Sequence, residues 1–467
     1  MRRLHVLSTL PFIVAVLAVS AVSAQPPAVR AFVGATLVDG TGRPAAPGAV
    51  VVIRGDRIEC AGPPASCPVP AGGETIDVSG KWLIPGLVDA HVHYSQTGWA
   101  DGRPDALDMR ARFPYDSTMA ALKDPTPYWR SYLCSGVTAT FDVGGFPWTW
   151  SLRERAEASG NAPHVSAAGP LLSTRDHWLN VPAERQFLFI PTDSAVDAGA
   201  RYLILNGTSA VKVWFLAGAG AEDTAGWKAR LMRAGQKAAS ARVPLIVHAT
   251  NLWGAKQAVA AGAALLVHGV SDVEVDDAFL SAARTHGTVY TPTLIVNDGY
   301  AQLRARRFGA AAYDLACIDP ATRAKAFLTD SLPGRPDEAA IERTRSQAEV
   351  RFAREAANVL RVHRAGIPVA MGTDAGNPLT LHGPSVFLEM DALQRAGLTP
   401  MEVLVAATRN GALAMGRLAD FGTVEAGKLA DLVILDADPV ADIANARRTL
   451  LVVRAGVVHR KSDLEYR

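Results

Sequence analysis

Short apolar runs alternate with amphipathic stretches along the central part of the chain. Each run is rich in Val, Ile, Leu and Ala, and the stretch after it repeats its apolar positions with the period of a helix. This alternation predicts eight β-to-α units, which fit an α/β fold of the closed (β/α)8 TIM-barrel type. The predicted strands are residues 86–93, 137–143, 164–168, 210–215, 244–248, 264–268, 288–293 and 368–374.

Both ends of the chain have a different pattern, in which short β-branched runs are broken by Gly and Pro. Examples are AVVVIRGDRIECAG near one end and TLLVVRAGVVHR near the other. Neither end has enough strands to bury a core alone, so we expect the two to form one small β-sandwich. The predicted domains are this sandwich in two parts, residues 25–84 and 417–467, and a barrel at residues 85–416.

The first 24 residues have the pattern of an export signal peptide. Arg2 and Arg3 precede an apolar run at residues 10–22, and a VSA sequence precedes Gln25. The run is shorter than the roughly 18 to 20 residues that cross a bilayer, which favours cleavage over a retained anchor. We expect an exported protein, periplasmic or secreted, with no stable membrane insertion after cleavage.

The charge balance argues against a nucleic-acid partner. The chain has 47 basic and 45 acidic residues, and loss of Arg2 and Arg3 with the signal makes the two numbers equal. A protein without net positive charge lacks the electrostatic attraction that drives binding to a phosphate backbone. The composition does not decide the oligomeric state, and a homo-oligomer is one of the alternatives.

The four cysteines are compatible with disulfides in an exported protein. Cys60 and Cys67 flank the short segment AGPPAS, and a disulfide between them is favoured over two free thiols. Cys134 and Cys317 lie far apart in the sequence, and the pattern assigns them no partner. The sequence therefore predicts one disulfide and leaves the other two thiols open.

Histidines end several predicted strands, where a TIM barrel builds its site. His91 and His93 are two residues apart at the end of the first strand, so both imidazoles point to one side. His248 and His268 end the fifth and sixth strands. A single histidine of this kind is more often a hydrogen-bonded core residue, but two on consecutive strands favour a metal site over coincidence.

Lys212 and Asp374 are two further candidates on strands. Lys212 lies inside the apolar strand SAVKVWF, where a buried ammonium is costly. Its side chain is either carboxylated to a carbamate that bridges two metal ions, or it reaches the strand end or pairs with a carboxylate. Asp374 ends the eighth strand within GTDAGNP, and its alternative role is to cap the following helix.

Together these elements resemble the amidohydrolase superfamily, in particular the branch of imidazolonepropionase-like enzymes and metal-dependent Xaa-Pro dipeptidases. The matching segments include PGLVDAHVH, AVKVW, VHG, GTDAG, HGPSVFLEMDALQRAGLTP and GTVEAGKLADLVILD, and they are spread over nearly all of the chain after the signal. The resemblance implies that His91, His93 and Asp374 bind one divalent metal ion. It also implies that His248 and His268 bind a second.

Carboxylated Lys212 is implied to bridge the two ions. Nitrogen and oxygen ligands favour zinc, while manganese, cobalt or iron, and a single metal, stay open. In the implied reaction a metal-bound hydroxide attacks the substrate carbonyl, and Asp374 is the catalytic residue that carries a proton to the leaving nitrogen. The resemblance thus predicts a metal-dependent hydrolase of carbon–nitrogen bonds.

The expected substrate is a small peptide-like amide, such as a dipeptide or an N-acyl amino acid. Aromatic residues in the loops after the first three strands favour an apolar substrate group, although packing of the loops explains them equally well. They include Tyr94, Trp99, Tyr128, Trp129 and Trp178.

Three further residues, His177, Tyr290 and His382, are candidate substrate contacts. Two alternative functions stay open at this point. One is a hydrolase of cyclic amides, lactones or phosphoesters, which the same hydroxide would attack. The other is a non-catalytic protein that binds a metal or a small molecule on the same scaffold.

Overall fold

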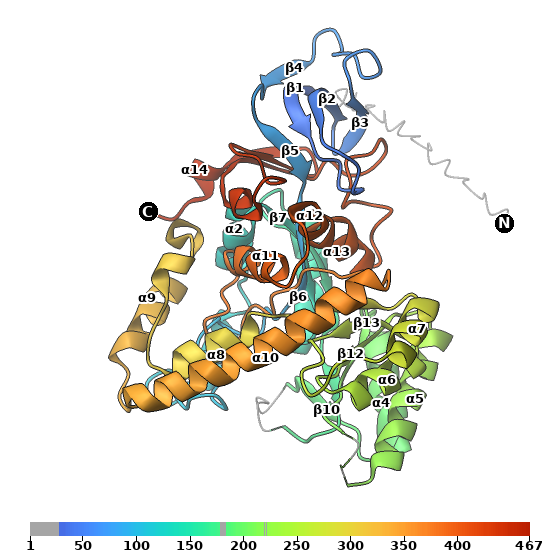
Figure 1. Cartoon of the computed structure of the whole chain (residues 1–467), viewed down its shortest axis with the longest axis vertical. Helices are drawn as coiled ribbons and strands as arrows, with labels where there is room; N and C mark the ends of the chain where they lie inside the picture. The colour runs from blue at the N-terminus through green and yellow to red at the C-terminus, as the bar shows by residue number, and fades with distance from the viewer. Residues whose placement is uncertain (1–27, 178–183, 219, 221) are drawn as a thin grey trace, which may run out of the picture.

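The computed structural model describes residues 28–177, 184–218, 220 and 222–467 of the chain. The predicted export signal and Trp178 lie outside the described residues. The N-terminal strands lie at one end of a larger body of strands and helices (Figure 1). Within the described residues, no helix combines the length and the apolar character needed to cross a membrane.

Two parallel sheets form the centre of the larger body. The first consists of β6 (Leu87–Val92), β7 (Val137–Asp142) and β8 (His164–Ala167). The second has the order β10 (Phe187–Phe189), β9 (Leu171–Ser173), β11 (Val211–Trp214), β12 (Leu245–His248), β13 (Ala263–Val267) and β14 (Val289–Thr291). The strands predicted first to seventh are found here, and their nearly continuous burial is typical of a sheet covered on both faces.

Hydrogen bonds connect the two parallel sheets at both edges. Ser209 N, which lies just before β11, donates to the last residue of β8 at 3.0 Å. On the other side, the eighth predicted strand lies between β14 and β6. Ala370 N donates to Tyr290 O at 3.0 Å, and Ala90 N donates to Met371 O at 3.1 Å. The fold is therefore mixed α/β with parallel sheets, and the segment before Asp374 bonds to a strand on each side.

Helices follow the parallel strands along the chain. Near β12 and β13 lie α4 (Asp193–Leu205), α5 (Thr224–Ser240), α6 (Leu252–Ala260) and α7 (Asp277–His286) (Figure 1). Asp223, Asn251 and Asp276 begin α5, α6 and α7, and each side chain accepts a hydrogen bond from a free backbone N–H of the first turn.

The remaining helices lie before β9 and after β14. The early ones are η1 (Ala100–Gly102), α1 (Tyr115–Ala121), α2 (Thr126–Cys134), η2 (Pro147–Trp150) and α3 (Ser151–Glu157). The late ones are α8 (Val296–Arg304), η3 (Ala310–Ala312), η4 (Leu315–Cys317), α9 (Pro320–Leu328), η5 (Thr329–Ser331), α10 (Glu338–Arg364), α11 (Ser385–Arg395), α12 (Pro400–Ala407), α13 (Arg409–Ala414), η6 (Ile443–Arg447) and α14 (Lys461–Leu464). Figure 1 shows α10 as a long helix that crosses the body in front of the parallel strands.

The two ends of the chain pair in one eight-stranded sheet, which confirms the predicted association. Its order is β17 (Val457–Arg460), β16 (Thr449–Arg454), β15 (Leu432–Leu435), β5 (Trp82–Pro85), β1 (Val29–Leu37), β2 (Ala46–Arg54) and β3 (Arg57–Gly62), with β4 (Glu74–Asp77) beside β1. In the sheet the two ends meet at the antiparallel pair of β5 and β15, and an antiparallel bridge between Arg57 and Leu429 adds a second contact. The structure gives one continuous sheet, so a two-layered sandwich and the domain limits stay predictions.

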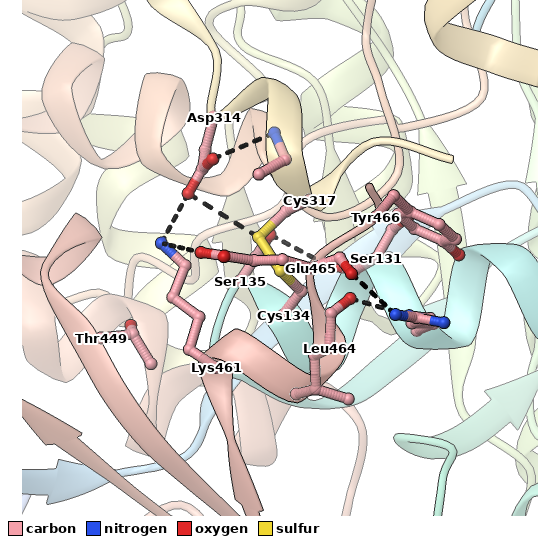
Figure 2. The surroundings of a disulfide bond; sticks show 12 residues. Ser131, Cys134, Ser135, Asp314, Cys317, Thr449, Lys461, Leu464, Glu465 and Tyr466 are labelled. Atoms are coloured by element: carbon pink, nitrogen blue, oxygen red, sulfur yellow. Dashed lines mark hydrogen bonds and ion pairs between the residues drawn. A yellow bond between two sulfur atoms is a disulfide. The ribbon is translucent and has the colours of Figure 1, made fainter. Parts of the chain in front are cut away.

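Two disulfides join the four cysteines. The predicted bond between Cys60 and Cys67 is confirmed. The second bond, which the sequence left open, joins Cys134 at the end of α2 to Cys317 in η4. Both of these cysteines are fully buried, and Figure 2 shows Leu464 and Tyr466 from the C-terminal segment beside them. Tyr466 N donates a hydrogen bond to the carbonyl of the residue before Cys317 at 2.8 Å. This bond holds the C-terminal segment next to the disulfide.

Loss of the Cys134–Cys317 bond is expected to destabilise the protein more than loss of the Cys60–Cys67 bond. The sequence separations are 183 and 7 residues, and the chain-entropy model gives about 5 and about 2.5 kcal/mol, respectively. Denaturant unfolding of Cys134→Ala/Cys317→Ala and of Cys60→Ala/Cys67→Ala measures both losses against the wild type. An equal loss in the two variants, or a larger one for the short loop, would contradict the prediction.

Candidate metal centre

A cavity of about 210 Å³ opens where the parallel strands end. Five of the six predicted ligands line it, namely His93, Lys212, His248, His268 and Asp374. The sixth, His91, is fully buried directly behind Asp374 and His93. Because these residues come from β6, β11, β12, β13 and the eighth strand segment, the parallel arrangement brings their side chains together.

His91, His93 and Asp374 form the tightest group. Asp374 Oδ1 lies 3.2 Å from His91 Nε2 and 3.0 Å from His93 Nε2, and the two imidazole nitrogens are 3.3 Å apart. His93 Nδ1 lies 2.6 Å from Gly144 O, a contact that places its proton on Nδ1 and leaves Nε2 with a lone pair. A lone pair and a carboxylate oxygen at this distance repel each other unless a positive charge lies between them. The donor set therefore fits a divalent cation.

His248 and His268 extend this group along the cavity. Their ring centroids are 4.3 Å apart, and the His268 ring is 4.9 Å from the His91 ring. Burial lowers the pKa of His91 to about 4 and that of His248 to about 3, and it also lowers the pKa of His268. At neutral pH these imidazoles are uncharged, which is the state that binds a metal.

Lys212 is buried in the same cavity. It makes no hydrogen bond or ion pair with any residue that the structure describes, and only 2% of it is exposed. Burial lowers the pKa of its ammonium group to about 7, although the carboxylates of Asp374 and Asp142 oppose the shift. A large share of the amine is then neutral at physiological pH, and the neutral amine is the form that reacts with carbon dioxide.

The residues that end the sixth and eighth strands have unusual backbone conformations. His268 and Asp374 have φ angles of 75° and 62°, and Thr293, whose Oγ1 lies 2.8 Å from His268 Nδ1, has a φ of 50°. Non-glycine residues rarely adopt this left-handed conformation, and those that do are concentrated at functional sites. The turn at each strand end is what directs the side chain into the cavity.

Two buried carboxylates hold three of the strand ends in place: Asp89 bonds to the eighth, and Asp142 bonds to the first and the second. Asp89 accepts hydrogen bonds from Thr373 N at 2.9 Å and from Thr373 Oγ1 at 2.6 Å, next to Asp374. Asp142 accepts bonds of 3.1 Å from Tyr94 N and from Gly144 N. Burial raises the pKa of both carboxyl groups, for Asp89 to about 7.

Of the three predicted substrate contacts, the structure brings one to the cavity. His177 lines it beside Phe187, with ring centroids 4.7 Å apart. Tyr290 and His382 are not among the described residues that line it. Tyr290 Oη accepts a bond from Val270 N at 2.8 Å, and His382 bonds to Tyr132 Oη and Gln96 O at 2.9 Å each. Both are buried in the core, with 1% and 2% of their surface exposed.

The aromatic wall of the cavity comes from residues that the sequence did not single out. Phe187 and Trp214 line it, whereas Tyr94 and Trp99 after the first strand are fully buried in the core. The cavity is also lined by several polar side chains from separate loops and from α8: Gln96, Arg103, Gln186, Asn297, Tyr300 and Asn377. No local pattern marks them, because they come together only through the fold.

The sequence matches the model of the family described as "Amidohydrolase family" over residues 82–458. The imidazolonepropionase of Rhizorhabdus wittichii is 26% identical over 407 residues, which cover 80% of this chain and 85% of that protein. The imidazolonepropionase of Caulobacter vibrioides is 50% identical over 44 residues, but the match spans only 9% of this chain and 11% of the relative.

Solved structures share the fold over most of the chain. A Xaa-Pro dipeptidase with methionine in its active site superposes with a TM-score of 0.70 and 20% identity, covering 93% of this chain and 100% of that chain. The ochratoxinase of A. niger gives a TM-score of 0.69 and 20% identity, covering 93% and 96%. Phenylurea hydrolase B gives 0.69 and 22%, covering 93% and 97%. At these identities the likeness concerns the fold.

Proposed function

Because this chain belongs to the amidohydrolase family, we propose that it is a metal-dependent enzyme that cleaves the amide bond of a dipeptide or an N-acyl amino acid. The family assignment makes the chain a hydrolase of carbon–nitrogen bonds. The observation that carries the substrate proposal is one cavity in which the imidazole and carboxylate cluster lies beside an aromatic wall. Small peptide-like amides fit such a cavity.

The proposed ligands of a first metal are His91, His93 and Asp374, and those of a second are His248 and His268. Lys212, as a carbamate, would contact both, and zinc suits this set of nitrogen and oxygen donors. A divalent cation supplies polarisation of the substrate carbonyl and lowers the pKa of a water molecule. A single metal on the first three ligands is the simpler variant of the same proposal.

Asp374 is the proposed acid–base group. Its Oδ1 contacts His91 and His93, so Oδ2, which lies 3.9 Å from His268 Nδ1, is the oxygen that accepts a proton from the attacking water. The same oxygen then returns the proton to the leaving nitrogen.

The proposal also includes the architecture of the fold and the location of the protein. The hydrogen bonds at both sheet edges support a closed (β/α)8 barrel. The proposed location is outside the cytoplasm, in the periplasm or secreted, on the strength of the N-terminal sequence pattern and two disulfides.

A second candidate function is hydrolysis of a cyclic amide. It is supported by the similarity to the imidazolonepropionase of Rhizorhabdus wittichii over 80% of this chain. The two candidates differ in their products, because a linear amide yields two molecules and a cyclic amide yields one.

A substrate screen with and without metal tests the proposal. Protein stripped with a chelator and reloaded with zinc is given dipeptides, N-acyl amino acids, cyclic amides, lactones and phosphoesters. We expect amine release from linear amides by the reloaded protein, and at least about a hundredfold less from the stripped protein. Turnover that survives complete metal removal would refute the metal-dependent mechanism. Ring opening without cleavage of any linear amide would favour the second candidate.

A further inference from the structure

A guanidinium group lies in the cavity beside the proposed metal centre. Arg103 follows η1 in the loop that starts after His93, and it lines the cavity together with His93 and Asp374. Its side chain is 18% exposed, so the charged end is largely shielded yet accessible from the cavity. A guanidinium in this place can contact a ligand in the cavity.

Neighbouring side chains fix the orientation of this guanidinium. Asp105 accepts from Nε at 2.9 Å and from Nη2 at 2.7 Å, and Asn377 Oδ1 accepts from Nη1. Tyr300 Oη donates to the same Asn377 oxygen at 2.7 Å, and its ring centroid is 5.6 Å from the guanidinium carbon. Asn377 Nδ2 donates to Asp374 O at 3.0 Å. Arg103 is therefore linked through Asn377 to the turn that carries Asp374.

Arg103 keeps donor capacity that its neighbours do not use. A guanidinium has five N–H bonds, and the contacts with Asp105 and Asn377 engage three of them. Among the described residues no further acceptor is bonded to it. The remaining N–H bonds, one on each terminal nitrogen, suit the two oxygens of a carboxylate, which arginine binds in a planar pair.

The other cations on the cavity wall are less suited to this role. Lys212 belongs to the proposed metal centre, and Arg351 is 41% exposed and bonded to Glu355 at 2.9 Å. An apolar part of the wall contains Phe187 and Trp214, whose ring centroids are 5.1 Å apart. The cavity thus offers a guanidinium and an aromatic surface next to the donor cluster.

We propose that Arg103 is a specificity-determining residue that binds the free carboxylate of the substrate's amino-acid part. The apolar side chain of that amino acid then packs on Phe187 and Trp214. The inference rests on the proposed amide hydrolysis and narrows it to peptides and N-acyl amino acids with a free carboxylate, in preference to their carboxamides.

The test compares N-acetyl-L-phenylalanine with N-acetyl-L-phenylalaninamide on zinc-loaded protein. Arg103→Gln is expected to lower kcat/KM for the carboxylate substrate by on the order of a hundredfold, mainly through KM, and to change that for the carboxamide by less than about threefold. Arg103→Lys should restore only part of the loss, because an ammonium cannot make the planar pair. Arg110→Gln is the control, since Arg110 lies in the same loop, is 51% exposed and pairs with Asp108.

Two results would overturn the proposal. One is an equal loss for both substrates in Arg103→Gln, which indicates a purely structural role. The other is a wild type that cleaves both substrates equally well. If no amide of either form is cleaved, the proposed function fails, and calorimetric binding of L-phenylalanine against L-phenylalaninamide then decides about Arg103. Stronger binding of the amino acid, lost in Arg103→Gln, supports the inference, and equal binding of the two refutes it.

Discussion

Replacement of Asp374 by asparagine is expected to lower kcat by at least about a hundredfold while the fold is kept. Asparagine has nearly the same shape, and it tolerates the left-handed backbone that Asp374 adopts with a φ of 62°. It has no carboxylate oxygen that accepts and returns a proton, so the proton transfer to the leaving nitrogen is lost. Steady-state kinetics with the best linear amide substrate measures the effect.

The metal content of Asp374→Asn has to be measured alongside its rate. A variant that retains zinc and the wild-type melting temperature but turns over slowly has lost the proton carrier. Asp56→Asn, in an exposed turn between β2 and β3, controls for the chemical change itself and should leave kcat unaltered. Near-normal turnover of Asp374→Asn with full metal content would disprove the assigned role.

Replacement of Lys212 by methionine is expected to lower kcat/KM by roughly a thousandfold, which corresponds to about 4 kcal/mol of transition-state stabilisation. Methionine fills the buried space of Lys212 but cannot become a carbamate. The proposed bridge between the two metals is then missing, and the metal content should fall from two ions to one or fewer. Kinetics and elemental analysis of the same preparation measure both effects.

The carbamate itself can be observed without any substrate. Isotope-labelled bicarbonate should give a carbamate carbon signal in the wild type during zinc loading, and this signal should be absent in Lys212→Met. Lys228→Met, which alters an exposed lysine on α5, is the matched control and should keep both signal and activity. A Lys212→Met protein with two bound metals and wild-type activity would exclude the bridging role.

Much of the fold could be predicted from the sequence, because short stretches of neighbouring residues are enough to indicate the strands. Apolar runs such as residues 244–248 predict β12 and place His248 at its end, because a strand buried on both faces needs a continuous apolar sequence. The spacing of His91 and His93 likewise fixes their common direction. These features depend on neighbouring residues, so the sequence displays them directly.

The rest of the site depends on contacts between distant segments. Arg103 and Asn377 are 274 positions apart in the chain, and nothing near either residue predicts that they meet. His382 is a candidate substrate contact in the sequence, but the structure buries it in the core, where it stacks on Tyr128 with ring centroids 4.2 Å apart. The Cys134–Cys317 bond could not be predicted from the sequence either, because four cysteines alone do not specify their pairing.

The Cys134–Cys317 disulfide keeps the molecule in one piece after a protease has cut the chain between these cysteines. Strands β7 to β14 all lie between Cys134 and Cys317. A single protease cut at a loop in this interval therefore produces two fragments that stay attached through sulfur. Gel electrophoresis of nicked protein should give one band without reductant and two bands with it. The disulfide keeps the two fragments of the nicked protein together.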